Sequence, residues 1–276
     1  MSENLEDRLI GKDDSEALAL AARIWALKMT NAANSSHIGS SLSVIDILSV
    51  LYSGVADISP TNWESANRDV VILSKGHAAA GLYAVLGLKG FISKEDLQNY
   101  CKDGSNFGGH VTHHGKIGVE LSTGSLGHGL PYGLGIALSL KLKQSDSKVY
   151  VVMSDGECDE GTVWESALLA QQYSLDNLIV IIDRNRLQSL TSTENTVALE
   201  PFADKWSAFN WDVLTVDGHS HDNLRKALVK SKRPLCVIAD TVKGKGVSFM
   251  ENTILWHYRP PNTEELKMAL SELGAK

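Results

Sequence analysis

Residues 148–185, KVYVVMSDGECDEGTVWESALLAQQYSLDNLIVIIDRN, decide the fold. Two apolar runs without polar alternation, 149–154 and 178–182, flank a segment whose apolar residues recur at helical spacing. Because neither run alternates, both strands should be buried on two faces, which is typical of a parallel sheet covered by helices. The stretch therefore predicts a strand, a helix and a second strand of one parallel sheet.

The same order of elements occurs on both sides of this unit. VVIL at 70–73 precedes a small-residue helical stretch, SKGHAAAGLYAVLGL. Residues 211–242 repeat the pattern as WDVLTVDGHS, HDNLRKALVKS and PLCVIADTV. With no internal repeat or Pro-rich linker, we expect one domain over residues 1–276. Its expected class is doubly wound α/β, a mostly parallel sheet with helices on both faces.

Three further segments are predicted as helices. Residues 14–31 carry Leu and Ala at three- and four-residue spacing, with Asp14 or Ser15 as the cap. Residues 42–52 are apolar almost all round and should be buried. The stretch TEELKMALSELG forms the last helix before the C-terminus.

Composition and charge narrow the class of protein. The chain has 276 residues, 43% of them hydrophobic and 21% charged, with a net charge of -7, as in ordinary globular proteins. No run of Lys and Arg could follow a nucleic acid backbone. Three scattered cysteines fit a reducing compartment. The acidic N-terminus, MSENLEDRLIGKDD, lacks the apolar core of a secretory signal, and no apolar run approaches a membrane span. The expected location is the cytoplasm, without nucleic acid or membrane partners.

Polar residues follow both strands of the central unit. Asp155 and Gly156 come directly after the first strand, and Asn185 and Leu187 follow the second. Ligands of parallel sheets bind at the carboxyl ends of strands, and a helix starting near Glu160 would present free N–H groups to an anion. A carboxylate, an amide oxygen, a backbone carbonyl, phosphate oxygens and a water make an octahedral site for Mg²⁺ or Ca²⁺. This edge therefore predicts a metal and diphosphate clamp.

These motifs resemble the thiamine diphosphate enzymes, in which Asp-Gly is followed some thirty residues later by Asn. The chain is most similar to the transketolase family, because SSHIGSSLS, SKGHAAAGLYA, STGSLGHGL, SDGECDEG and KGKGVSFMEN occur in transketolase order. The resemblance covers nearly the whole chain and implies the thiamine diphosphate-binding fold. One departure is Ser154, where the family usually has Gly before the Asp.

The resemblance implies a set of site residues. Metal ligands would be Asp155, Asn185 and the carbonyl of Leu187. The catalytic histidines would surround the substrate and the diphosphate, with His110 facing substrate hydroxyls; they are His37, His77, His110 and His257. Cofactor contacts would come from His77, Gly124, Ser125, Leu126, Asp155, Gly156, Glu157, Glu160, Asn185 and His257, with Leu126 beside the aminopyrimidine.

Other interpretations of these residues stay open. Asp155 and Asn185 could be simple turn residues, and the loop around Gly127 could serve only helix packing. The stretch GGHVTHHG could form a zinc cluster, although no suitable Cys or carboxylate lies nearby. His219 and His221 are predicted to cap the helix that follows them. His128 stands where many family members carry Gln, which leaves a cofactor contact there open.

One catalytic group has no candidate in this sequence. Thiamine chemistry needs a carboxylate bonded to the aminopyrimidine. In transketolases that glutamate belongs to a pyrimidine domain C-terminal to the region matched here. The resemblance thus implies the N-terminal subunit of a split transketolase, transferring a two-carbon ketol unit between sugars within an α2β2 heterotetramer. The alternatives are a subunit of a 2-oxo acid decarboxylase or dehydrogenase, and a truncated non-catalytic homologue. The sugar and the partner chain stay open.

Overall fold

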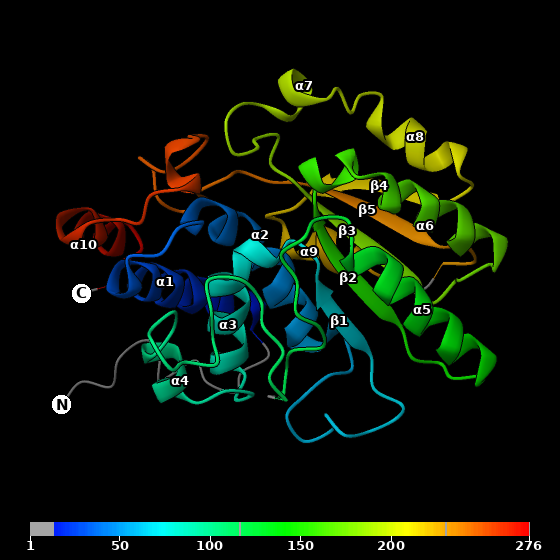
Figure 1. Cartoon of the computed structure of the whole chain (residues 1–276), viewed down its shortest axis with the longest axis horizontal. Coiled ribbons are helices and arrows are strands. Elements are labelled where there is room, and N and C mark those ends of the chain that lie inside the picture. The colour runs from blue at the N-terminus through cyan, green and yellow to red at the C-terminus, as the bar shows by residue number, and fades with distance from the viewer. Residues whose placement is uncertain (1–13, 116, 230, 276) are drawn as a thin grey trace.

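The computed structural model describes residues 14–115, 117–229 and 231–275 (Figure 1). The acidic N-terminal stretch discussed above falls almost entirely outside these ranges. At the centre lies a five-stranded sheet of order β1-β2-β3-β5-β4, in which every neighbouring pair is parallel. The strands are β1 (Val70–Leu73), β2 (Val149–Ser154), β3 (Leu178–Arg184), β4 (Asp212–Asp217) and β5 (Leu235–Asp240).

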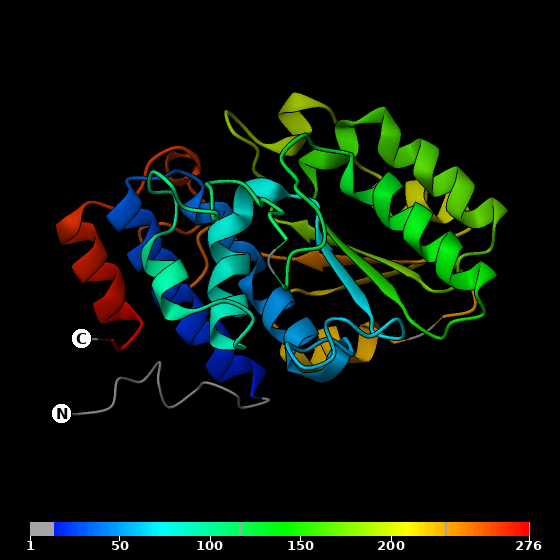
Figure 2. The same cartoon turned by 60° about the horizontal axis from the view of Figure 1, so that its bottom comes forward.

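Helices cover both faces of the sheet, as Figure 2 shows. They are α1 (Ser15–Ala33), α2 (Ile38–Val50), α3 (Ala79–Leu88), α4 (Lys94–Gln98), α5 (Gly129–Leu142), α6 (Gly161–Gln172), α7 (Thr193–Thr196), α8 (Phe202–Ala208), α9 (His221–Ala227) and α10 (Thr263–Glu272). Short 3-10 turns lie at Gly76–Ala78, Gly156–Asp159 and Leu255–His257, and a π-type turn at Leu51–Val55 extends α2.

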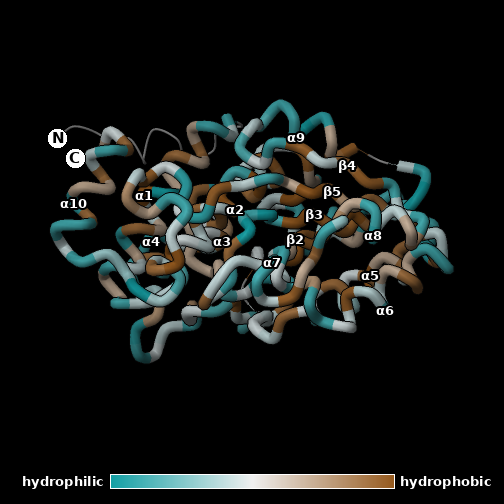
Figure 3. The backbone as a smooth tube through the Cα atoms, turned by 90° about the horizontal axis from the view of Figure 1, so that it is seen from above, coloured by the Kyte–Doolittle hydropathy of each residue, from teal (hydrophilic) through white to brown (hydrophobic). Residues whose placement is uncertain are grey.

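The alternate side chains of each central strand enter two separate cores. On β3, Ile179 and Ile181 pack with α1, α2, α3 and α9. Val180 and Ile182 pack with α5, α6 and α8 on the other face. Figure 3 shows the hydrophobic segments concentrated along the inner strands. The predicted doubly wound α/β class is therefore confirmed.

Helix α1 begins where the sequence predicts. The Asp14 side chain accepts hydrogen bonds from the N–H groups of Glu16 and Ala17, both at 3.1 Å, which satisfies two free donors of the first turn. The helix ends at Asn34, whose left-handed backbone closes the last turn. Asp14, and not Ser15, is the cap.

Helix α2 is buried along its entire length, as predicted, although it begins earlier, at Ile38. In the described part of the chain one stretch, Ile38–Val55, is long and apolar enough to cross a membrane, but 89% of it is buried inside the fold. Such burial is typical of a core helix of a globular protein. Within its apolar sequence α2 carries one ionisable side chain, Asp46.

The edge strand β4 differs from the prediction of strands buried on both faces. All six of its residues are partly or fully exposed, and Leu214 exposes 43% of its surface. β4 is an edge strand that pairs only with β5, but the other edge strand, β1, is fully buried, so edge position alone does not explain this exposure. The strands that carry the predicted clamp, β2 and β3, are fully buried.

Candidate cofactor site

The carboxyl ends of four neighbouring strands meet at one cavity. Ser74 and Lys75 follow β1, Asp155 follows β2, Asn185 follows β3 and Lys243 lies just beyond β5. The cavity has a volume of about 210 Å³. Small-molecule sites usually measure roughly 300–1,000 Å³, so this cavity suits one end of a cofactor. It is lined by Ser40, Lys75, His77, Leu126, Ser154, Asp155, Gly156, Asn185, Leu187, Gln188, Ser189, Lys243 and His257.

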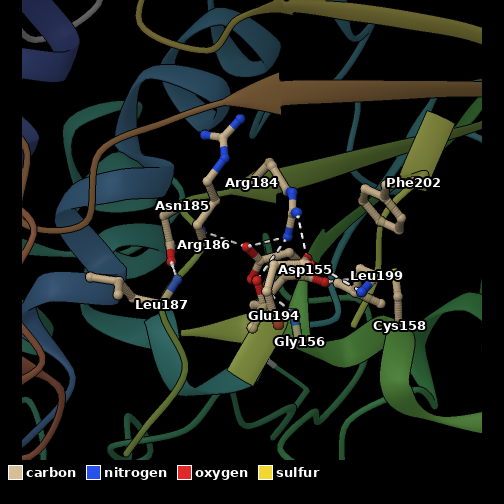
Figure 4. A network of polar contacts seen from close by, with 12 residues as sticks. Asp155, Gly156, Cys158, Arg184, Asn185, Arg186, Leu187, Glu194, Leu199 and Phe202 are labelled. Carbon is tan, nitrogen blue, oxygen red and sulfur yellow. Dashed lines mark hydrogen bonds and ion pairs between the residues drawn. The ribbon is translucent and has the colours of Figure 1, made fainter. Parts of the chain in front are cut away.

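The three predicted metal ligands line this cavity together. Asp155 Oδ2 accepts the backbone N–H of Arg186 at 2.6 Å, and Oδ1 accepts that of Gly156 at 2.8 Å (Figure 4). Asn185 Oδ1 accepts the N–H of Leu187 at 3.1 Å, and this fixes the amide orientation. A carboxylate, an amide and a main-chain carbonyl therefore share one small space.

This donor set fits a hard divalent cation. Within the described ranges no group of three or more His, Cys, Asp or Glu side chains could hold a metal ion. A site with one carboxylate must take its other oxygens from amide, backbone, water and phosphate groups, which is how Mg²⁺ is commonly held beside phosphates. The residues present thus fit a metal bound together with a diphosphate. The same finding leaves the zinc interpretation of GGHVTHHG without support.

Asp155 lies in a strongly buried electrostatic network. Its side chain is 2% exposed, and burial raises the pKa of its carboxyl, against the Arg186 N–H and the Arg184 guanidinium, which lower it. Arg184 lies 3.4 Å from Asp155, and its other nitrogen donates to Glu194 at 3.0 Å (Figure 4). The same nitrogen donates to Glu200 at 2.9 Å. The guanidinium thus links the segment after β3 to the candidate metal ligand.

Two lysines of the cavity were not selected from the sequence. Lys75 is fully buried and forms an ion pair with Asp183. Lys243, 1% exposed, donates to the carbonyl of Leu187 at 3.2 Å and lies 3.0 Å from His257 Nδ1. Burial, followed by the charge of Lys75, lowers the pKa of Lys243 to about 8. Burial of a charged ammonium costs free energy, and an anionic ligand in the cavity would offset that cost. Lys243 is therefore suited to bind an anion.

The four histidines predicted as catalytic come together from distant parts of the chain. The ring centre of His37 lies 5.4 Å from that of His77, 5.5 Å from His110 and 4.9 Å from His257. Burial is the main reason that the pKa falls to about 4 at His37, to about 3 at His257, and well below the ordinary value at His77. These three imidazoles are neutral near pH 7 and can both donate and accept hydrogen bonds. Their catalytic roles stay a prediction.

The glycine-rich loop reaches the cavity through one of its predicted residues. Leu126 lines the cavity, and a Cβ at Gly124 would lie 3.3 Å from the ring of the exposed His110, which would have to shift slightly. Ser125 is exposed and lies outside the cavity. Gly127 has a φ of 79°, a backbone conformation that favours glycine.

Glu157 and Glu160 do not reach the cavity. Glu157 is fully buried, where its oxygens accept the Gly127 and Ser154 N–H groups at 2.9 and 3.2 Å and the Ser74 hydroxyl. These bonds join Glu157 to the glycine loop, and its side chain does not line the cavity. Glu160 is exposed. Neither side chain lines this cavity, and their direct contacts with the cofactor stay a prediction.

The remaining histidines have other partners. His128 is exposed, with Nδ1 2.9 Å from the Leu126 carbonyl, and it does not line the cavity. The prediction that His219 and His221 cap α9 is wrong, because Ser220 accepts the N–H of Asn223 as the cap. Both imidazoles bond Asp46 instead, at 2.6 and 3.0 Å.

Comparison with known proteins agrees with this geometry. The family model "Transketolase, thiamine diphosphate binding domain" matches residues 14–276. Over 248 residues, 88% of each chain, the protein is 41% identical to an apulose-4-phosphate transketolase subunit of Phocaeicola vulgatus. It is 37% identical to a 6-deoxy-6-sulfo-D-fructose transketolase subunit of Clostridium sp., over 86% of this chain and 88% of the relative.

Solved structures and longer relatives give the same family. A transketolase of Campylobacter jejuni superimposes with a TM-score of 0.89 at 33% identity, covering 94% of this chain and 42% of that one. Human transketolase is 36% identical over 86% of this chain, which spans 38% of the human protein. The chain therefore belongs to the transketolase family and has the fold of its thiamine diphosphate-binding domain.

Proposed function

We propose that this chain is the diphosphate-binding subunit of a split transketolase, which transfers a two-carbon ketol unit from a ketose to an aldehyde. The observation that carries the proposal is the single cavity shared by the oxygens around Asp155, the ammonium of Lys243 and two of the four clustered histidines. These groups can hold a metal diphosphate at one end and sugar hydroxyls nearby. Relatives named as transketolase subunits of matching length support the split arrangement.

In this proposal the metal is Mg²⁺ or Ca²⁺, held by Asp155, Asn185 and the Leu187 carbonyl. Lys243, which lines the same cavity, would balance part of the diphosphate charge. Bound thiamine diphosphate supplies the electron sink for carbon-carbon cleavage.

The histidines would act on the substrate. His37, His77 and His257 are neutral, so His37 and His77 can each donate to one sugar oxygen and accept from another. His257, whose Nδ1 accepts from Lys243, can donate through Nε2. His110, the exposed member of the cluster, would contact hydroxyls farther from the reacting carbonyl. The protein would thus orient the ketose and move protons between its hydroxyls.

The carboxylate that bonds the aminopyrimidine would come from a partner chain with a pyrimidine domain. We propose an α2β2 heterotetramer in the cytoplasm, with each cofactor at an interface between unlike chains. The small cavity of this chain supports that arrangement, because it suits only one end of the cofactor.

The test combines this chain with a candidate pyrimidine-domain chain. Mg²⁺ and thiamine diphosphate should raise the melting temperature of the complex, and ketol transfer should require both chains. Donor sugars should include apulose 4-phosphate and 6-deoxy-6-sulfo-D-fructose, for which two relatives are named. Consumption of a 2-oxo acid without ketol transfer would favour the decarboxylase alternative. Absence of both reactions, with no cofactor-dependent stabilisation, would favour a non-catalytic homologue.

A further inference from the structure

A second cluster of buried ionisable groups lies around Asp46 of α2, which is 4% exposed. Arg23 donates to both oxygens of this carboxylate, at 3.1 and 2.5 Å. The carboxylate also accepts hydrogen bonds from His219 and His221. Arg23 and the two histidines come from different parts of the chain, and the function proposed above does not use them.

Two members of this cluster hold the loop that carries Lys243. His219 Nε2 accepts the backbone N–H of Val242 at 2.8 Å, one residue before the lysine. Arg23 Nε donates to the carbonyl of Lys245 at 3.2 Å, two residues after it. Two side chains that both bond the Asp46 carboxylate therefore hold the segment 242–245 by hydrogen bonds on either side of Lys243.

The hydrogen bonds define the proton position on His219. Since Nε2 accepts from Val242, the proton must be on Nδ1, where it is donated to Asp46 at 2.6 Å. Asp46 thereby orients the ring, as a carboxylate orients a histidine ligand in many binding sites. His221 bonds Asp46 and Ser15 but makes no hydrogen bond to the segment.

We propose that His219 is a positioning residue that places the Lys243 ammonium in the cofactor cavity. The hydrogen bond from the Val242 N–H to Nε2 holds the backbone at Val242. It thereby sets the direction of the Lys243 side chain, which follows. The consequence for diphosphate binding rests on the function proposed above. The placement of Lys243 does not depend on that function.

Two substitutions distinguish the role of Nδ1 of His219 from that of Nε2. In His219→Asn, the amide can replace Nδ1 toward Asp46 but leaves the Val242 N–H without its acceptor. In His219→Gln, the longer side chain can offer an oxygen near the Nε2 position. We expect the Asn variant to bind inorganic diphosphate with Mg²⁺ roughly tenfold more weakly, as for loss of supporting contacts in other sites, and the Gln variant to stay close to wild type.

The matched control is His221→Asn, which perturbs the same carboxylate without touching the segment 242–245. Calorimetric titration of the full chain measures diphosphate affinity, and the acylation rate of Lys243, followed by mass spectrometry, measures its placement. His219→Asn should change the acylation rate several-fold, and the other two variants should not. The inference would be overturned if folded His219→Asn matched wild type in both diphosphate affinity and acylation rate. It would also be overturned if His221→Asn lost as much affinity as His219→Asn. If wild type binds no diphosphate even together with its partner chain, the proposed function fails, and acylation alone decides this inference.

Discussion

Asp155 and Asp46 are both buried carboxylates beside an arginine, yet their surroundings differ. Asp46 receives hydrogen bonds from Arg23 and two histidines, which hold the pKa of its carboxyl far below the usual range despite burial. Asp155 faces a cavity, and burial raises the pKa of its carboxyl in spite of Arg184. A buried charge with all its partners inside the protein maintains the fold. One that lines a cavity beside an amide and a carbonyl oxygen is available to a ligand.

The largest effect on stability is expected at Asp46. Asp46→Asn leaves the Arg23 guanidinium buried without its counter-charge, which should lower the free energy of unfolding by roughly 3–5 kcal/mol. Urea denaturation of the ligand-free protein measures this loss. Asp222→Asn is the control, because that carboxylate exposes 81% of its side chain. A loss below about 1 kcal/mol at Asp46 would mean that the cluster is not a structural element.

Asp155→Asn should affect ligand binding most. It should also cost some stability without ligand, because the amide NH2 faces a backbone N–H that the carboxylate accepts in wild type. The amide keeps the shape of the side chain but removes the only carboxylate of the proposed metal site. In wild type, a hundredfold excess of ligand over its Kd should add about 2.7 kcal/mol of stability, and the variant should lose most of this gain. Melting curves with and without Mg²⁺ and thiamine diphosphate give both values.

The control for this comparison is Asp159→Asn in the neighbouring turn. Asp159 bonds Gln188 and does not line the cavity, so its variant should keep the ligand-dependent gain. An undiminished response of Asp155→Asn would contradict the assignment of the metal ligands.

A smaller effect of opposite sign is expected at Lys243. Burial lowers the pKa of this lysine from 10.5 to about 8, a shift that corresponds to about 3 kcal/mol. Lys243→Met removes that cost together with two hydrogen bonds, so the ligand-free protein should gain about 1–2 kcal/mol. Inorganic diphosphate should bind more weakly. Lys245→Met, in the same loop with a partly exposed ammonium, should change neither quantity.

The sequence predicted the elements of this site better than their contacts. The positions after β2 and β3 follow from strand patterns, because parallel strands bring their carboxyl ends to one edge. Lys243 was missed, although KGKG follows β5 at this same edge. Its proximity to Leu187 depends on which strands are neighbours, and strand order is a property of the whole fold.

Histidines and acidic residues were harder to place, because their roles depend on partners far away in sequence. Asp46 is an isolated charge in an apolar helix, and that pattern alone indicates a buried ion pair. The sequence does not show that its partners include His219, 173 residues away, so this histidine was taken for a cap. Glu157 was assigned to the cofactor for the same reason, since its bond to Gly127 joins separate segments.

The smallest effect concerns pH and the histidine cluster. The pKa of His37 is about 4 in the folded chain and near 6.5 when exposed, so the unfolded chain takes up a proton first as the pH falls. Stability present above pH 6.5 is therefore lost progressively toward pH 4, by roughly 1–2 kcal/mol for a half-buried ring. His37→Gln should flatten this part of the curve, measured by urea denaturation between pH 4 and 7. His114→Gln, at an exposed position, should not. If His37→Gln retained the full acid dependence, the loss would have to come from His77 and His257, whose pKa values are also lowered, or from carboxylates.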